Sequence, residues 1–275
     1  MKKLFAIISL GLLTLSLSAQ EEARWIRKSC ISPDGQTIAF SYQGDIFTVP
    51  SAGGTARQVT VNSAYDSDPL WTADGQNIVF SSYREGSKDI WIIPAEGGKA
   101  RRLTTYPGAE TPLFVSKDGQ VYYQANIQAD PQFGDYPWTA QVYTVNIQTG
   151  RSSLFNSTTM WTLSVNANDI ILYEDYKGYE DPLRKHHTSS VTHDIWKYLP
   201  KKGQYQKISR YVGENRNPVF ASNGEDYYFL SEQGGNFNVW KSNINTPEAA
   251  FQITSLPTHP VRNLSISGAN RLAFS

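Results

Sequence analysis

Apolar and polar residues follow a repeating order along the chain, and the repeat is most regular between residues 32 and 104. Residues 32–60 and 72–104 share the same parts in the same order: an Asp-Gly turn, an alternating apolar run, a polar loop, a run that opens Asp-Ile-aromatic, a Gly-Gly turn and a closing strand. Periods of about 40–50 residues with four short strands are typical of propeller blades. The pattern predicts an all-β propeller of four-stranded antiparallel blades.

The turns set the register of the remaining copies. Turns related to Asp34-Gly35 recur at 74–75, 118–119 and 223–224, and in weaker form near 167–168 and 267–270. Asp-Gly and Asn-Gly favour positive φ at the central turn residues, so each turn is expected to join the first strand of a blade to the second. We expect five complete blades plus the first half of a sixth. Blades one to six are assigned to residues 24–60, 61–104, 105–155, 156–209, 210–254 and, as a partial blade, 255–275.

Within each blade the apolar runs place the remaining strands. Second strands are expected at 37–41, 77–81, 121–124, 170–173, 227–230 and 271–274. Third strands are expected at 45–49, 89–93, 141–145, 194–198 and 238–241, and fourth strands at 56–60, 100–104, 152–155, 205–209 and 251–254. A half blade exposes an apolar edge, which propellers avoid, so we expect the natural protein to continue past Ser275.

The loop between the second and third strands changes length from blade to blade. It spans 42–44 in blade one and 82–88 in blade two, grows to 125–140 and 174–193 in blades three and four, and shortens to 231–237 in blade five. These loops share one end of the disc, which indicates that this end carries binding. The alternative is that they are ordinary hydrophilic insertions. The residues expected to contact a substrate or partner are Trp138, Tyr176, Tyr179, Arg184, Lys185, His186 and His187.

Composition and the first residues bear on partners and location. The formal net charge is +0 with a pI near 6.9, so no global charge favours a nucleic acid, and none is expected as a partner. Residues 1–19 combine Lys2 and Lys3 with a short apolar run and a small-residue exit, the pattern of a secretory signal peptide. We expect an exported protein, periplasmic or extracellular, without membrane insertion. Cys30 is the only cysteine, so no intramolecular disulfide can form.

Several sequence patterns that suggest chemistry have a simpler structural explanation. His186, His187 and His193 lack a metal-ligand spacing, and Ser189 or Ser190 lies in no G-x-S-x-G elbow. Asp45, Asp89 and Asp194 open third strands, where they are expected to cap loops through hydrogen bonds to the backbone. The Gly-Gly pairs lie in hairpins with no helix following, unlike a phosphate loop. We therefore predict no catalytic residue, cofactor or metal ion in this segment.

The repeats SPDGQTIAFS, GDIFTVP and GGTARQVT, with their second copy ADGQNIVFSS, DIWIIP and GGKARRLT, resemble Tol-type and tricorn-type propellers. The wider match, which includes the blade-four stretch RKHHTSSVTHDIWKY, resembles the N-terminal six-bladed propeller of secreted bacterial tricorn-protease homologues. It covers residues from about 24 to 275.

The tricorn resemblance implies a multidomain serine peptidase with a PDZ domain, whose nucleophile lies in later domains of the same chain. This segment would be a non-catalytic domain that handles or gates peptides or unfolded proteins, and it would contact those downstream domains. A homo-oligomer is also compatible with the sequence. Two alternatives are a non-enzymatic periplasmic Tol-type propeller that binds a protein, and the propeller of a prolyl-oligopeptidase-like hydrolase.

Overall fold

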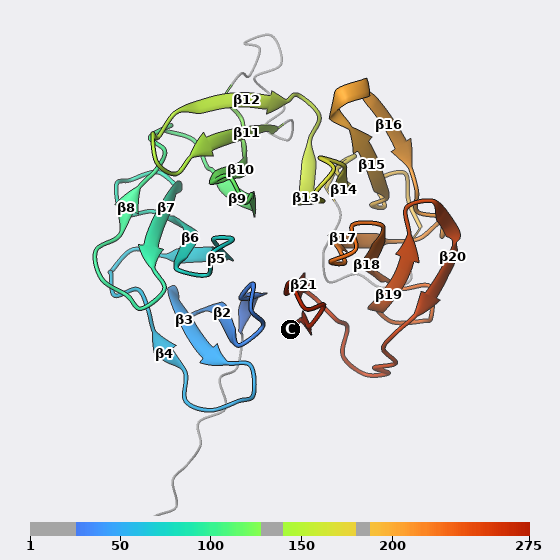
Figure 1. The fold of residues 1–275 in the computed structure, drawn as a ribbon, viewed down its shortest axis with the longest axis horizontal. Coiled ribbons are helices and arrows are strands. Elements are labelled where there is room, and N and C mark those ends of the chain that lie inside the picture. Colours follow the sequence, from blue (N-terminus) through green and yellow to red (C-terminus); the bar gives the residue numbers. More distant parts are fainter. Residues whose placement is uncertain (1–25, 128–139, 180–187) are drawn as a thin grey trace, which may run out of the picture.

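The computed structural model describes residues 26–127, 140–179 and 188–275 and forms five four-stranded antiparallel sheets and one two-stranded sheet around a central axis (Figure 1). Blades one to three comprise β1 (Arg27–Ile31), β2 (Thr37–Tyr42), β3 (Asp45–Pro50), β4 (Arg57–Gln58), β5 (Asp66–Trp71), β6 (Asn77–Ser82), β7 (Asp89–Pro94), β8 (Arg101–Arg102), β9 (Thr111–Val115), β10 (Gln120–Ala125), β11 (Gln141–Asn146) and β12 (Ser152–Asn156). The expected propeller, with five complete blades and half of a sixth, is confirmed.

Blades four to six follow the same order of strands around the axis. They comprise β13 (Met160–Val165), β14 (Ile171–Asp175), β15 (Ile195–Leu199), the 3-10 turn η2 (Pro200–Lys202), β16 (Gln204–Lys207), β17 (Asn215–Phe220), β18 (Asp226–Ser231), β19 (Asn238–Asn243), β20 (Thr246–Gln252), β21 (Ser265–Ile266) and β22 (Leu272–Ala273). β20 begins earlier than expected because Thr246 pairs directly with Asn243 across a short turn. No helix within the described ranges has the length and apolar character of a membrane span.

The turns between first and second strands differ in one respect from the expectation. In four of them, positive φ is confined to the glycine, as at Gly35 with φ 75°. The preceding acid instead fixes the turn, because Asp34 Oδ1 accepts hydrogen bonds from the Ser32 hydroxyl at 2.5 Å and the Gln36 amide at 3.0 Å. Asp169 and Asn270 take the positive-φ position in blades four and six, which explains why those turns are weak in the sequence.

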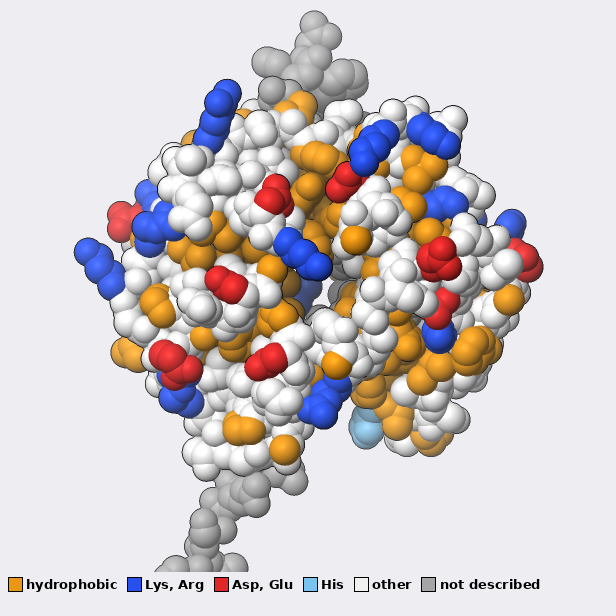
Figure 2. Space-filling model, in the orientation of Figure 1, with side chains coloured by type: hydrophobic (Ala, Val, Ile, Leu, Met, Phe, Trp, Pro, Cys, Tyr) orange, Lys and Arg blue, Asp and Glu red, His pale blue; other side chains and the backbone are white. Residues whose placement is uncertain are grey.

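The apolar core is divided into layers between neighbouring blades. Val79 and Ile90 of blade two pack with Val121 and Tyr123 of blade three, and four similar clusters join the other consecutive pairs from blade one to blade six. Burial on both faces explains the nearly continuous apolar runs of the second strands. Figure 2 shows one face of this disc, where acidic and basic side chains are interspersed and the surface is hollowed at the centre.

The half blade closes the ring between blades five and one. Ile31 N donates to Ser265 Oγ at 3.0 Å, and Arg271 Nη1 donates to Gly35 O and Ser51 Oγ, each at 2.8 Å. On the other side Asn217 Nδ2 donates to the carbonyl of Leu264 at 3.0 Å. The sixth blade therefore contributes the inner hairpin that holds the first and last complete blades together.

One end of the disc joins the variable loops to the connectors between blades. The first-strand amides of Asp66 and Asn215 donate to the loop carbonyls of Gly44 at 2.7 Å and His193 at 3.0 Å in the preceding blades. The Glu110 amide donates an equivalent backbone hydrogen bond to the Lys88 carbonyl at 2.8 Å. The loops and connectors therefore share one end, which we call the loop end, and the Asp-Gly turns lie at the opposite end.

Candidate functional site

An aromatic pair on blade four, Trp161 and Tyr176, is the most distinctive feature of the loop end. Trp161 lies in β13, the innermost strand of its sheet, and Tyr176 follows β14. Their rings stack with centroids 4.9 Å apart and planes 14° apart, and the edge of His193 contacts both. Trp161 nevertheless remains 44% exposed. We call Trp161 and Tyr176 the aromatic platform.

Trp161 lies at a β-bulge near the start of its strand. In β13 the residues Met160 and Thr162 pair with Asp175 and Glu174, so Trp161 is an extra residue with no partner in β14. In blade two the bulge lies further along the first strand: Asp66 and Ser67 pair with Ser82 and Ser81, and the register shifts only between Ser67 and Leu70. A bulge of this kind bends the strand and redirects its side chain. While Met160 is fully buried, Trp161 is therefore directed out of the sheet.

A buried ion pair lies beside the platform. His193 Nδ1 is 2.6 Å from Glu174 Oε1, and both side chains are almost inaccessible to solvent. Burial alone disfavours the charged form of each residue, but the hydrogen bond and opposite charge of the partner reverse this effect. The pKa of His193 is raised above its usual value, and the pKa of Glu174 is lowered. The pair therefore holds the imidazole in a fixed orientation against the two aromatic rings.

Glu174 also connects blade four to blade five. Its Oε2 accepts hydrogen bonds from the Asn217 amide at 2.9 Å and from the Thr162 hydroxyl at 3.1 Å. Asn217 has positive φ at the bulge of β17, which presents its amide to the carboxylate. The buried Glu174 carboxylate thus makes hydrogen bonds to β13, to His193 and to blade five.

Asp194, which follows His193, makes several hydrogen bonds at the end of the blade-four loop. It accepts hydrogen bonds from Lys177 at 2.7 Å, Lys207 at 2.9 Å and the Ser209 hydroxyl at 2.6 Å. Burial raises the pKa of Asp194, but the hydrogen bonds from Lys177 and Ser209 outweigh it and leave the pKa below its usual value. A carboxylate held by two lysines is not placed to orient a catalytic histidine.

The interpretation of the third-strand acids as loop caps changes in detail. Asp45 accepts from the side chains of Gln58 at 3.0 Å and Thr60 at 3.2 Å, whereas bonds from the backbone were expected. Thr60 Oγ1 in turn accepts from the Ile46 amide at 2.9 Å. Asp45 therefore fixes the Thr60 hydroxyl, and this hydroxyl binds the Ile46 amide of the third strand.

The structure places two of the expected contact residues. Tyr176 is part of the platform, and Tyr179 is 73% exposed three residues later. The other expected residues lie outside the described residues: Trp138, Arg184, Lys185, His186 and His187. Of the histidines considered for a metal site, His193 is described and is bonded to Glu174.

The sequence reasoning missed Trp161, Glu174 and His193 as a unit. The first strand of blade four gave the only available signal. The first strands of blades two, four and five each contain one bulge, but in blade four it falls at Trp161, nearer the start of the strand, which shows only after strand pairing is known.

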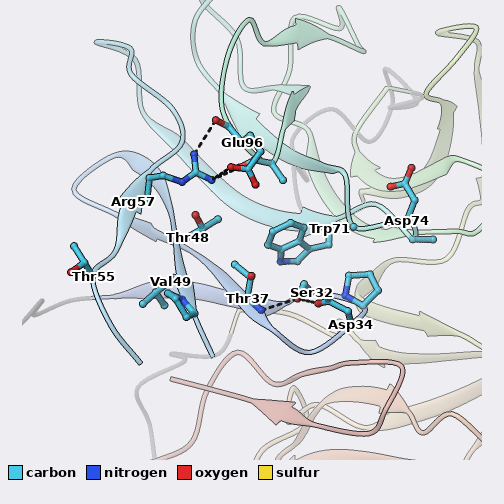
Figure 3. Close-up of a pocket in the computed structure, with 15 residues that line it drawn as sticks. Ser32, Asp34, Thr37, Thr48, Val49, Thr55, Arg57, Trp71, Asp74 and Glu96 are labelled. Carbon is cyan, nitrogen blue, oxygen red and sulfur yellow. Dashed lines mark hydrogen bonds and ion pairs between the residues drawn. The ribbon is translucent and has the colours of Figure 1, made fainter. Parts of the chain in front are cut away.

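A groove of about 790 Å³ lies between blades one and two (Figure 3). Arg57 crosses to blade two, where it donates to the carbonyls of Ala95 at 2.8 Å and Glu96 at 2.9 Å and pairs with the Glu96 carboxylate at 3.3 Å. Trp71 Nε1 donates to the carbonyl of Cys30 at 3.0 Å. Because these groups hold the two blades together, the groove is better explained by blade packing than by ligand binding.

Comparisons with known proteins agree with this architecture. The structure superposes on tricorn protease with a TM-score of 0.75 at 17% identity, covering 91% of this chain and 24% of that one. It also superposes on a putative TolB from Agrobacterium tumefaciens with a TM-score of 0.65 at 14% identity, covering 84% of this chain and 81% of that one. For TolB from Acinetobacter baumannii the TM-score is 0.62 at 14% identity, with 89% and 56% covered.

These structural likenesses show the fold, and the chain spans about a quarter of the length of tricorn protease. The family described as the tricorn protease N-terminal beta propeller domain matches residues 23–275. Since this match includes nearly all of the sequence, the chain belongs to the tricorn protease N-terminal β-propeller family.

Proposed function

We propose that this propeller handles and gates peptides or unfolded proteins for a tricorn-like serine peptidase and is itself non-catalytic. The observation that carries the proposal is the exposed aromatic platform of Trp161 and Tyr176 at the loop end, on the innermost strand of blade four and directly after it. Exposed, rigidly held aromatic rings suit transient contact with extended chains, whose side chains are accessible. Family membership supports the peptidase context.

A binding experiment tests the handling role. Fluorescence anisotropy would compare reduced, carboxymethylated α-lactalbumin, which is unfolded, with the native protein. We expect the unfolded chain to bind and the native protein not to bind. The double variant Trp161→Leu/Tyr176→Ala should weaken binding of the unfolded chain. Equal binding of both forms, or no binding of either, would count against the proposal.

The proposal also includes the absence of peptidase chemistry in this segment. A purified protein that begins at Gln20 should not hydrolyse a fluorogenic peptide. Hydrolysis that disappears in the Ser189→Ala or Ser190→Ala variant would contradict the non-catalytic role. The Ser189 hydroxyl accepts a hydrogen bond from the Val191 amide at 3.2 Å within the loop.

The second candidate function is protein binding by a non-enzymatic periplasmic propeller of the Tol type. The observation that favours it is the structural likeness to the TolB proteins of two bacteria, with TM-scores of 0.65 and 0.62. The expected signal peptide at 1–19 fits an exported protein in either case, and it lies outside the described residues. Capture of a folded periplasmic partner, with no preference for unfolded chains, would favour this second function.

A further inference from the structure

Several carboxylates cluster near the aromatic platform in the part of the chain that the structure describes. The ionisable side chains linked to His193, Arg216 and Lys177 by contact or charge include five carboxylates: Glu174, Asp175, Asp194, Glu214 and Glu232. Lys177 and Arg216 interact with these carboxylates, and Lys207 is bonded to Asp194. A cluster rich in carboxylates attracts cations and repels other carboxylates.

The basic side chains of this set are already engaged elsewhere. Lys177 and Lys207 are bonded to Asp194 at 2.7 and 2.9 Å. Arg216 pairs with Glu214 at 3.0 Å and lies over the ring of Phe237, 5.1 Å from its centroid. Among the described residues, the cation–π contacts do not involve Trp161 or Tyr176. The platform therefore keeps its cation-attracting ring surface available.

The geometry of the platform suits one flat cation. Tyr176 stacks on one face of Trp161, and Trp161 is still 44% exposed. His193 fixes the two rings through its edge contacts and is itself fixed by Glu174. Indole is the strongest of the aromatic partners for ammonium and guanidinium groups. The chain already uses this chemistry internally, where Arg84 lies 5.4 Å from the ring centroid of Trp91.

We propose that the Trp161–Tyr176 platform binds a cationic side chain, above all the guanidinium of arginine, in an extended peptide. The guanidinium stacks on the exposed surface of Trp161, and the carboxylates on blades four and five supply the complementary field. This inference rests on the proposed function, since it names the peptide feature that the loop end selects. It assigns the role to two aromatic residues on blade four and to no residue outside the described ranges.

The test uses two capped pentapeptides, acetyl-Gly-Ser-Arg-Ser-Gly-amide and the same peptide with citrulline in place of arginine. Citrulline keeps the shape of the side chain and removes its charge. Calorimetric titration of the whole chain should show binding of the arginine peptide and about tenfold weaker binding of the citrulline peptide. Affinity should also fall as salt is added.

Variants separate ring chemistry from folding. Affinity for the arginine peptide should decrease from the parent to Trp161→Phe and again to Trp161→Leu. Phe251→Ala, which removes an exposed aromatic ring from outer strand β20, is the matched control and should bind like the parent. Equal affinity for the arginine and citrulline peptides, or full affinity in a folded Trp161→Leu protein, would overturn the inference. Unfolded α-lactalbumin could still bind in that case, so the handling role would be judged separately.

Discussion

Two buried glutamates show how a partner decides the charge of a carboxyl group in this fold. Glu174 meets His193 and Arg216, and its pKa is lowered despite its burial. Glu110 lies just before β9 beside Asp89, and burial raises its pKa to about 7, against the hydrogen bond from the Thr104 hydroxyl. Its Oε1 atom has no hydrogen-bond donor among the described residues. Glu110 is therefore a source of pH-dependent stability, which the apolar pattern alone cannot reveal.

Replacing Glu110 by Gln should remove this pH dependence. A raised pKa in the folded state means that the stabilising contribution is complete below the unfolded value near 4.5 and is lost as the pH rises through about 7. At pH 8 we expect Glu110→Gln to raise the free energy of unfolding by about 2 kcal/mol over the parent. At pH 4 the two proteins should be similar. Urea unfolding at both pH values measures the difference.

The matched control for Glu110 is Glu96→Gln, since the Glu96 side chain is 92% exposed. It should change stability little at either pH. An equal gain at pH 4 and pH 8 for Glu110→Gln would contradict the assignment, because it would show that the carboxylate charge is not the cause.

The His193→Gln variant should lose most stability at low pH. Since the pKa of His193 is raised, its stabilising charge is fully present below the unfolded value near 6.5 and is lost as the pH rises through the folded value. Gln leaves the buried Glu174 without its charged partner, so we expect a loss of about 3 kcal/mol at pH 6 and a smaller loss at pH 9. Thermal unfolding across this range provides the measurement.

A double variant with Glu174→Gln checks that the effect of His193 belongs to the pair. Removing both charges should restore part of the stability lost in His193→Gln at pH 6. Additive losses from the two substitutions would show that the groups act independently.

At the level of strands and turns, the repeated elements could be predicted from the sequence, whereas the bulges that interrupt the repeat could not. The Asp-Gly turns and apolar runs located the second and third strands closely, for example at Asn77–Ser82 and Gln141–Asn146. The bulges of the first strands were not predicted, because a single extra residue produces no hydrophobic period. For the same reason Trp161 could not be assigned to a surface until its strand was paired, although Tyr176 was recognised from the length of its loop.

The turn of blade one offers a test of ring closure, because two glycines have nearly the same conformation. Gly35 and Gly119 have φ of 75° and 76°, so alanine at either position is strained by about 1 kcal/mol. A Cβ atom at Gly35 would lie 3.1 Å from Ser267 Oγ of the half blade, whereas one at Gly119 would meet nothing within 4 Å. Gly35→Ala should therefore lose about 1 kcal/mol more stability than Gly119→Ala in urea unfolding.

Equal losses from the two glycine substitutions would mean that blade six can move away from blade one without cost. Gly35→Ala/Ser267→Ala removes the nearest contact atom, leaves Ser267 Cβ at 3.3 Å and should recover part of the additional loss. Recovery in the double variant separates the contact across the blade boundary from backbone strain, which remains unchanged.

Across the whole molecule, each blade packs against its neighbours around the ring, but the contacts between blades are not equally extensive. Complete blades join through broad apolar layers, such as the cluster between blades two and three. At the closure, the two-stranded sixth blade meets blade one through a few polar contacts of Ser265, Gly268 and Arg271. Local opening begins where buried apolar contacts are fewest, so the boundary between blades six and one is the expected place.

Arg271→Ala should weaken this boundary while the rest of the disc is unaffected. The guanidinium bridges Gly35 O and Ser51 Oγ of blade one at 2.8 Å, and alanine removes both bonds. Losing about 1–2 kcal/mol of local stability would speed hydrogen exchange at the boundary about tenfold. The Ile31 amide and the amides of β21 and β22 should show this increase by mass spectrometry.

The matched variant Arg101→Ala, which removes the bond to Ile147 O between blades two and three, should have a local effect there and leave β21 unchanged. Uniform acceleration across all blades in Arg271→Ala would instead show that the ring opens as one cooperative unit.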